Sequence, residues 1–369
     1  MIIQVGPYPP PLGGISMYIK RIKQNLDLKN IDNIVLNVYS DDNYQYFNNN
    51  IKKVKLKKLF IYIMKNNEEN TIFHYNITGF KGKLYVFLLN KICKFKGKKI
   101  ITLHGDCNEL FLKKKISMRK ILNSFDIIIC VKKGDKKCLI ENGVRTSIYE
   151  IPAYINPVLN QNEYNSIPKN IKSFIENSKF LICANGAIRF HDGQDLYGLD
   201  ILINFMKKIK FEFPNVKLLF CLLSKSFQNK KESEYYKKIK NDILKFELQS
   251  NILIYEVKDT EFAPILSKSK LFIRPTNTDG DAISIRESLY LNIPCIASDI
   301  VVRPKNVILF KNRDVDSLYE KFKSLKINYD KNIENLKKDV SKDNFNDILK
   351  LYNFLDKNEL KDCEKNVKS

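Results

Sequence analysis

The sequence alternates twice between short apolar, β-branched runs and longer amphipathic runs. Short apolar runs separated by helix-length segments are typical of parallel strands joined by helices. The pattern therefore predicts an α/β fold with two Rossmann-like, doubly wound parallel sheets. We expect the strands at residues 2–5, 33–39, 71–75, 99–103, 126–131, 147–151, 180–184, 216–222, 252–255, 271–273 and 294–297.

The two series of strands are separated by a polar stretch, residues 156–169, that contains two prolines and several asparagines. We place a domain linker there, between an N-terminal domain of residues 1–160 and a C-terminal domain of residues 161–335. Residues 336–369 are expected to form a helical segment that packs back on the body. Two such sheets in series leave a cleft at the carboxyl ends of their strands, where open α/β sheets bind ligands.

The 369 residues carry a formal net charge of +22, from 63 Lys plus Arg against 41 Asp plus Glu. Only eight of the basic residues are Arg, which is the residue preferred for bidentate recognition of phosphate and guanine. The charge therefore gives little support to nucleic-acid binding, and we expect no nucleic-acid partner. Basic, partly apolar stretches at residues 51–65 and 91–99 favour contact with an anionic membrane, although solvated helix faces are the alternative.

The eight cysteines include no CxxC pair and no ligand-like spacing to histidine. They predict buried thiols of a reducing compartment. The chain start lacks the charged and apolar regions of a secretory signal, and no segment reaches the roughly 18 uninterrupted apolar residues of a membrane span. We expect a cytoplasmic protein that is at most peripheral to a membrane.

Two motifs follow strand ends in the expected N-terminal domain. Gly13 and Gly14 precede an amphipathic helix, where paired glycines let the backbone approach an anion; a plain strand-to-helix turn is the alternative. The spacing differs from the G-x-G-x-x-G fingerprint, which disfavours a dinucleotide-dependent dehydrogenase. His104 follows strand 99–103 and suits a hydrogen bond to a ligand, or a structural cap on the next element.

Two further motifs follow strand ends in the expected C-terminal domain. Arg189 suits a phosphate clamp, with an exposed loop charge as the alternative. After strand 271–273, a polar turn leads to a helix that begins at Ala282 with Asp281 as its N-cap. The free N–H groups and positive dipole end of this helix suit a diphosphate, while Asp279 and Glu287 suit sugar and ribose hydroxyls. An N-cap on an exposed surface helix is the alternative.

At these residues the sequence resembles the family 4 glycosyltransferases, retaining enzymes with the GT-B fold of two Rossmann-like domains that face a cleft. The family carries two glutamates separated by seven residues, and this chain has Asp279 and Glu287 at that spacing. The segments 274–276 and 293–299 and the Gly13-Gly14 loop are similar as well. The resemblance covers about residues 1–325 and rests mainly on residues 274–299.

The resemblance implies a role for each matched position, as follows. Asp279 would contact the donor sugar and Glu287 the ribose; the backbone amides of Gly280, Asp281, Ala282, Ile283 and Ser284 would hold the sugar and diphosphate; Arg189 would neutralise the phosphates; His104 would contact the sugar from the other domain; and Gly13 and Gly14 would lie by the phosphates or the acceptor. Two departures from the family pattern concern the donor geometry. Asp279 is one methylene shorter than the usual Glu, and the Lys that usually follows the phosphate-binding Arg is replaced around Tyr197-Gly198.

The resemblance thus implies a retaining transferase that moves a sugar from a nucleotide-diphosphate sugar to a glycan or lipid-linked acceptor in cell-surface polysaccharide or lipopolysaccharide biosynthesis. The leaving diphosphate would take the acceptor proton, so no dedicated base is required. We expect no cofactor and no metal, because the sequence from Asp279 to Asp281 fits the family helix better than a metal site. The alternatives are a nucleotide-sugar epimerase of the same fold, a phosphorylase-like enzyme, which would need a lysine-rich cofactor site, and a non-catalytic basic protein that binds nucleotides or nucleic acid.

Overall fold

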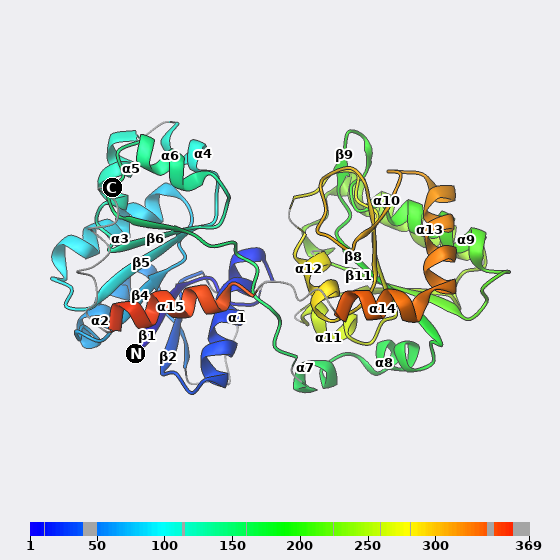
Figure 1. Cartoon of the computed structure of the whole chain (residues 1–369), viewed down its shortest axis with the longest axis horizontal. Helices are drawn as coiled ribbons and strands as arrows, with labels where there is room; N and C mark the ends of the chain where they lie inside the picture. Colours follow the sequence, from blue (N-terminus) through cyan, green and yellow to red (C-terminus); the bar gives the residue numbers. More distant parts are fainter. Residues whose placement is uncertain are drawn as a thin grey trace. The chain divides into compact units, whose positions relative to one another are not determined.

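The computed structural model describes residues 1–10, 12–39, 50–112, 115–159, 161–223, 225–258, 260–280, 282–337 and 343–356. The chain divides into two compact units, called unit 1 (Met1–Val158 with Asp343–Ser369) and unit 2 (Leu159–Lys342) (Figure 1). The first boundary lies inside the expected linker, and the C-terminal segment belongs with unit 1. Among the helices that the structure describes, none has the length and apolar character needed to cross a bilayer.

Unit 1 is built on a seven-stranded parallel sheet in the order β3-β2-β1-β4-β5-β6-β7. Its helices cover both faces, as expected for a parallel sheet that is buried on both sides. One face packs against α1 and α15, and the other packs mainly against α2, α3 and α5. The elements are β1 (Ile2–Gly6), α1 (Gly14–Leu28), β2 (Asn33–Asn37), β3 (Ile51–Lys53), α2 (Leu59–Lys65), β4 (Ile72–Tyr75), α3 (Phe80–Ile92), β5 (Lys98–Leu103), α4 (Cys107–Phe111), α5 (Lys115–Leu122), β6 (Ile127–Cys130), α6 (Asp135–Glu141), β7 (Ser147–Glu150) and α15 (Phe345–Asp356).

A buried polar link fastens α15 to this sheet. The ring of His74, on β4, bonds the Tyr352 hydroxyl through Nδ1 and the Thr102 hydroxyl through Nε2, each at 2.6 Å. Burial, reinforced by the charge of His104, lowers the pKa of His74 to about 3. The ring is therefore neutral, and its two bonds assign it a structural role between the C-terminal helix and the sheet.

Unit 2 is built on a six-stranded parallel sheet in the order β12-β11-β8-β13-β14-β15. Helices α9, α10 and α13 pack on one face, and α8, α11 and α12 pack on the other. The elements are α7 (Gln161–Asn165), α8 (Lys169–Glu176), β8 (Phe180–Gly186), the hairpin β9 (Phe190–His191) and β10 (Gln194–Asp195), α9 (Leu199–Ile209), β11 (Val216–Leu222), α10 (Lys230–Lys245), β12 (Ile252–Glu256), α11 (Phe262–Leu266), β13 (Leu271–Arg274), α12 (Ile283–Tyr290), β14 (Cys295–Ser298), β15 (Ile308–Phe310), α13 (Val315–Ile327) and α14 (Tyr329–Lys337).

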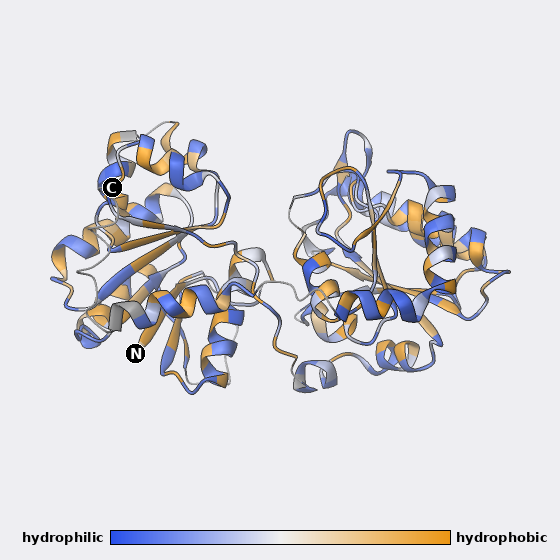
Figure 2. Cartoon of the chain, in the orientation of Figure 1, coloured by the Kyte–Doolittle hydropathy of each residue, from blue (hydrophilic) through white to orange (hydrophobic). Residues whose placement is uncertain are grey.

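The expected fold class is confirmed, because both units are α/β with a parallel sheet, and each expected strand is present. Figure 2 shows the physical basis: the strands are largely apolar, whereas the helices carry one polar and one apolar face. The sequence did not indicate β3, β15 or the β9–β10 hairpin. These strands have only two or three residues; β3 and β15 lie at sheet edges, and β9 and β10 pair only with each other. No apolar run marks β3, β9 or β10, and the apolar residues of β15 form a run too short to distinguish a strand.

Candidate active site

In unit 2, three neighbouring strands bring polar residues to one edge of the sheet. Asn185 lies near the end of β8, Arg274 ends β13 and Ser298 ends β14. Parallel strands place their carboxyl ends at the same edge, and β8, β13 and β14 are adjacent. This edge also carries the loop that follows β13 and leads to α12.

The carboxylate of Asp279 is the centre of this edge. Arg274 binds it through two contacts, Nε to Oδ2 and Nη2 to Oδ1, both 3.1 Å long. Arg303 donates from Nη1 to Oδ2 at 2.8 Å, the Thr276 hydroxyl donates to Oδ2 at 3.1 Å, and the Gly280 N–H donates to Oδ1 at 3.1 Å. A carboxylate has about four lone-pair sites, so these contacts use its full acceptor capacity.

The protonation state of Asp279 follows from two opposed influences. Burial is the largest and would raise the pKa of the carboxyl, but the hydrogen bonds and charges of Arg274 and Arg303 outweigh it. The pKa is therefore held below its usual value. At neutral pH the cluster contains one carboxylate between two guanidinium groups, all three with little exposure to solvent.

The cluster of Asp279, Arg274 and Arg303, called the Asp279 cluster, also joins the three strands to each other. Arg274 donates from Nη1 to the carbonyl and side-chain oxygens of Asn185 at 3.3 and 3.2 Å, and its guanidinium lies 5.0 Å from the centre of the Tyr197 ring. The Ser298 hydroxyl donates to the Thr276 carbonyl at 2.6 Å. The geometry of this edge is therefore fixed by the protein's own bonds.

Sequence reasoning missed Arg303, although its side chain is only 2% exposed. A signal was available in the composition, because the chain uses Lys almost everywhere and has only eight Arg. The fork of a guanidinium suits buried bidentate contacts that an ammonium cannot make. Where Arg is this rare, each one marks a candidate for such a contact.

Arg189, the expected phosphate clamp, follows β8 and is ion-paired with Glu232, with 2.7 Å between Nη1 and Oε2. Glu232 belongs to the capping box at the start of α10, where its carboxylate also accepts from the Asn229 N–H at 2.8 Å. The structure thus brings Arg189 to α10 and brings Asp279 to Arg274 and Arg303. Contact of Arg189 with a phosphate stays a prediction.

The helix that follows Asp279 begins at Ile283, with Ala282 as its N-cap residue. Its N-cap has no side-chain hydrogen bond and its first turn has no acidic residue. The first N–H groups of such a helix lack intrahelical acceptors and carry a partial positive charge. Glu287, on the next turn, is buried with 3% exposure. The expectation that the helix begins at Ala282 with Asp281 as its N-cap is wrong by one residue, because Ala282 is the N-cap. Asp281 itself lies outside the described residues.

In unit 1, His104 follows β5 at the carboxyl edge of the sheet. Its Nε2 donates to the Asn76 side-chain oxygen at 2.9 Å, and its ring meets the Tyr18 ring edge-on at 5.0 Å. Burial, followed by the charge of Lys83, lowers the pKa of His104 to about 4. The ring is therefore neutral near pH 7 and suits hydrogen bonding rather than charge neutralisation.

The Gly13-Gly14 loop borders a cavity of about 330 Å³ in unit 1. Gly13 precedes α1, and the Ser16 hydroxyl bonds both its N–H (2.9 Å) and its carbonyl (3.1 Å). A Cβ atom added at Gly14 would meet no atom within 4 Å, so the backbone there is open to a ligand. The cavity is lined by Pro7, Tyr8, Leu12, Gly13, Gly14, Ile15, Ser16, Tyr39 and Thr78.

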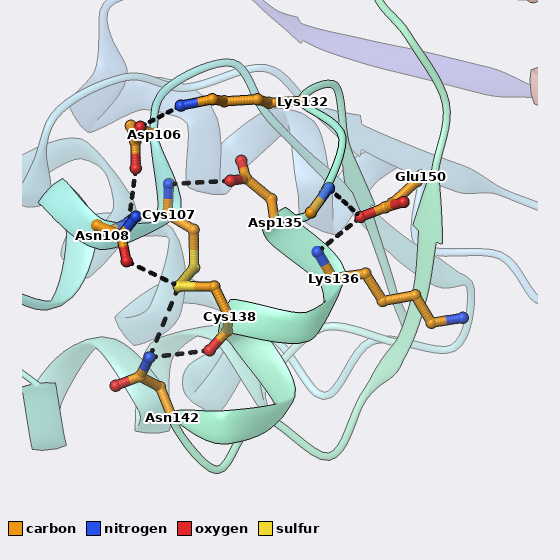
Figure 3. Close-up of a disulfide and its surroundings, with 10 residues drawn as sticks. Asp106, Cys107, Asn108, Lys132, Asp135, Lys136, Cys138, Asn142 and Glu150 are labelled. Carbon is orange, nitrogen blue, oxygen red and sulfur yellow. Dashed lines mark hydrogen bonds and ion pairs between the residues drawn. A yellow bond between two sulfur atoms is a disulfide. The ribbon is translucent and has the colours of Figure 1, made fainter.

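The loop that carries His104 leads directly into a disulfide between Cys107 on α4 and Cys138 on α6 (Figure 3). The expectation that all cysteines are thiols is wrong for this pair. The two residues are 31 apart in sequence, so no local motif marks them, but β5 and β6 are adjacent and bring α4 and α6 together, with 6.3 Å between the Cα atoms. The free cysteines that the structure describes are buried; Cys363 lies outside the described residues.

Within the ranges that the structure describes, no group of three or more His, Cys, Asp and Glu side chains is placed to hold a metal ion. Because Asp281 is not among the described residues, the expectation of metal independence stays a prediction.

Residues 193–343, nearly all of them in unit 2, match the family model described as Glycosyl transferases group 1. The segment that carries the Asp279 cluster thus matches the group 1 glycosyltransferases. An uncharacterized glycosyltransferase of Methanocaldococcus jannaschii is 25% identical over 340 residues, which cover 86% of each chain. The family resemblance seen at Arg274, Asp279 and Glu287 is thus supported by matches that extend well beyond that motif.

Solved structures of glycosyltransferases show that the chain has the GT-B fold. A glycosyltransferase from Rickettsia africae has a TM-score of 0.62 at 16% identity, with 97% of this chain and 99% of that chain covered. Sucrose-phosphate synthase from Thermosynechococcus elongatus has a TM-score of 0.58 at 14% identity, with 96% and 99% covered. The Anabaena protein Alr3699/HepE in complex with UDP-glucose has a TM-score of 0.55 at 12% identity, with 96% and 97% covered.

Proposed function

We propose that the protein is a retaining glycosyltransferase that moves a sugar from a nucleotide-diphosphate sugar to a glycan or lipid-linked acceptor in cell-surface polysaccharide biosynthesis. The observation that carries the proposal is the family match over unit 2, where an uncapped helix N-terminus follows the Asp279 cluster. The Anabaena neighbour, which was solved with UDP and with UDP-glucose, makes a uridine diphosphate sugar the first donor to test.

In this proposal the start of α12 binds the donor diphosphate. The N–H groups of Ile283 and Ser284 and the positive end of the helix stabilise the charge that develops on the leaving group. Arg189 contributes a further positive charge when its guanidinium contacts the phosphates while it remains paired with Glu232. Glu287 binds the ribose, and the diphosphate oxygen takes the acceptor proton on the face from which it departs.

Asp279 differs from the other residues proposed to contact the donor, because its carboxylate is already hydrogen-bonded by the protein. Its oxygens already accept from Arg274, Arg303, Thr276 and Gly280, so a sugar hydroxyl has to replace one of these donors. We propose that Asp279 acts mainly as a positioning residue, which fixes the loop of residues 275–280 that leads to α12. Direct contact with the sugar stays a prediction.

The donor is identified by thermal shift with nucleotide sugars and free nucleotides, followed by NMR of the product formed with each binding donor. We expect a shift with one nucleotide family that persists in EDTA, and a product with the anomeric configuration of the donor. Glu287→Gln is expected to weaken nucleotide binding at least tenfold, whereas Glu320→Gln, at an exposed position of α13, leaves it unchanged. An inverted product would refute the retaining mechanism, and a folded protein that binds no nucleotide would refute the donor assignment.

A second proposal concerns attachment to the cytoplasmic face of a membrane, where a lipid-linked acceptor resides. Helix α2 exposes Phe60, Ile61 and Met64 and follows Lys57 and Lys58, and α3 exposes Leu88 and Ile92. Apolar side chains flanked by lysines are favourable at an anionic bilayer surface.

Sedimentation with vesicles tests this surface. We expect binding to phosphatidylcholine vesicles that contain phosphatidylglycerol and little binding to phosphatidylcholine alone. Ile61→Ser combined with Met64→Ser reduces binding, whereas Phe211→Ser, at an exposed apolar residue of unit 2, does not. Equal binding by both variants would refute the proposal.

A further inference from the structure

Helix α3 of unit 1 carries a largely buried lysine, Lys83, that pairs with none of the residues that the structure describes. The side chain of Lys83 is 6% exposed, although the ammonium of a lysine normally reaches water or a carboxylate. Across the described ranges of the chain it makes no hydrogen bond and no ion pair. Burial lowers its pKa, and no carboxylate offsets this effect. Lys83 is thus a largely buried cation for which the described residues supply no counter-charge.

The ammonium lies toward the carboxyl edge of the unit 1 sheet. Lys83 is the fourth residue of α3, and side chains on a helix lean toward the helix N-terminus. Its charge also reaches His104, whose pKa it helps to lower. His104 follows β5, so the ammonium and the imidazole share the edge that carries the Gly13-Gly14 loop.

A second buried donor without an acceptor lies at the same edge. Asn76 directly follows β4 and is fully buried, and its side-chain oxygen accepts the bond from His104. Its side-chain nitrogen, Nδ2, has no hydrogen-bond partner among the residues that the structure describes. A buried amide donor with no acceptor costs free energy unless a ligand or a water satisfies it.

The start of α3 adds backbone donors that face solvent. Its N-cap is Gly79, so no side chain caps the first turn, which also contains no acidic residue. Thr78 and Gly79 are exposed, which gives a small ligand access to this end of the helix. The N–H groups of Lys81 and Gly82 lie in the turn where a helix has no acceptors of its own.

We propose that Lys83, the Asn76 amide and the first turn of α3 form a subsite for a phosphate group of the acceptor. An ammonium, an amide and helix N–H groups are all donors, and together they suit the several acceptor oxygens of a phosphate. The assignment to the acceptor rests on the proposed function, in which α12 of unit 2 holds the donor diphosphate. The binding of phosphate itself does not depend on that function and is measured without turnover.

The experiment measures the affinity of the whole protein for inorganic phosphate by calorimetry and thermal shift at constant ionic strength. The variants are Lys83→Met and Lys83→Gln. The matched control is Lys91→Gln, which removes the same charge from an exposed position in the last turn of the same helix, away from the proposed subsite. This control also accounts for diffuse anion binding by a protein of net charge +22. A second arm repeats the titration in saturating UDP.

We expect both Lys83 variants to weaken phosphate binding at least tenfold and Lys91→Gln to change it less than twofold. Lys83→Met is also expected to raise the melting temperature in the absence of phosphate, because it removes an unpaired buried cation. Phosphate binding that persists in UDP supports the acceptor assignment, and competition between the two would overturn it.

Equal phosphate affinity in wild type and Lys83→Met, or no phosphate binding by wild type, would overturn the subsite. A Lys83→Met protein that is less stable than wild type would show that the lysine is structural, and Lys83→Gln then provides the affinity comparison. Retained nucleotide binding in either case would leave the proposed transferase function intact. The two hypotheses are thus separated by which ligand fails to bind.

Discussion

The carboxyl edges of the two sheets are built in opposite ways. In unit 2 the buried charges satisfy one another, since Asp279 binds both Arg274 and Arg303. In unit 1 the Asn76 amide nitrogen is buried without an acceptor, and the mostly buried Lys83 has no carboxylate partner among the described residues. Paired buried ions fix a geometry before any ligand arrives, whereas unpaired ones carry a cost that a ligand can offset. The comparison predicts that substitutions at the two edges change stability in opposite directions.

The largest effect is expected at the paired edge. Asp279→Ala leaves two buried guanidinium groups without their carboxylate, which costs about 3–5 kcal/mol of unfolding free energy. Asp316→Ala is the control, because Asp316 pairs with Lys208 at the surface and should contribute far less. Calorimetry of the full chain, with hydrogen exchange to locate the change in unit 2, provides the measurement. Equal losses in both variants would mean that the cluster does not hold this edge together.

The disulfide gives unit 1 a different means of fixing its edge. Closing a loop of 31 residues is worth ~3–4 kcal/mol in the chain-entropy account. Reduction by dithiothreitol, or Cys107→Ser with Cys138→Ser, should lower the stability of unit 1 by about that amount. Hydrogen exchange should show the loss in α4 and α6 and leave unit 2 unchanged. The double variant lacks the disulfide, so dithiothreitol should not change its stability. A wild-type protein whose stability is unchanged by dithiothreitol would show that the disulfide does not stabilise unit 1.

The two units should also respond to acid in opposite directions. The folded-state pKa values of His74 and His104 are lowered to about 3 and about 4, from 6.5, so unfolded unit 1 binds more protons as the pH falls below 6.5. Each histidine then costs unit 1 about 2 kcal/mol at pH 5 relative to pH 7. In unit 2, burial and Asp200 raise the pKa of Asp195 to about 6, which adds about 1 kcal/mol on the same change of pH.

Unfolding at pH 7 and pH 5, resolved by unit through hydrogen exchange, checks these signs. His74→Gln should flatten the pH dependence of unit 1. His191→Gln, at the exposed histidine of unit 2, should leave the pH dependence of unit 1 stability unchanged. A unit 1 that gains stability at pH 5 would contradict the neutral, buried state of both rings.

Much of the fold was predictable because strand periodicity is local. The strands that end near Leu103, Ile273 and Ala297 are marked by their own apolar residues, and parallel order then brings their ends to one edge. Arg303 was not predictable in this way, because it lies 24 residues beyond Asp279 and reaches it only through the adjacency of β13 and β14.

The disulfide and the buried lysine were missed for related physical reasons. Cys107 and Cys138 meet because β5 and β6 are neighbours, which no spacing in the chain reveals. Lys83 is one of many lysines in the sequence, and only its burial by tertiary packing distinguishes it. Where a site depends on which strands are adjacent, sequence alone supplies the residues but not their partners.

The smallest effect on stability is expected at Gly14 in unit 1, where there is space for a side chain. Gly198 in unit 2, where there is none, provides the contrast. A methyl group at Gly14 meets no atom within 4 Å, so Gly14→Ala should change the unfolding free energy by less than about 0.5 kcal/mol. Gly198→Ala, in unit 2, is the opposite case, because φ is +66° and the new Cβ would lie 2.3 Å from the Pro275 carbonyl oxygen. If the Gly14 backbone approaches a substrate, Gly14→Ala raises a KM severalfold in a protein of normal stability. Unchanged kinetics in Gly14→Ala would show that the substrate does not contact this backbone. The two glycines would then serve only as a turn between β1 and α1.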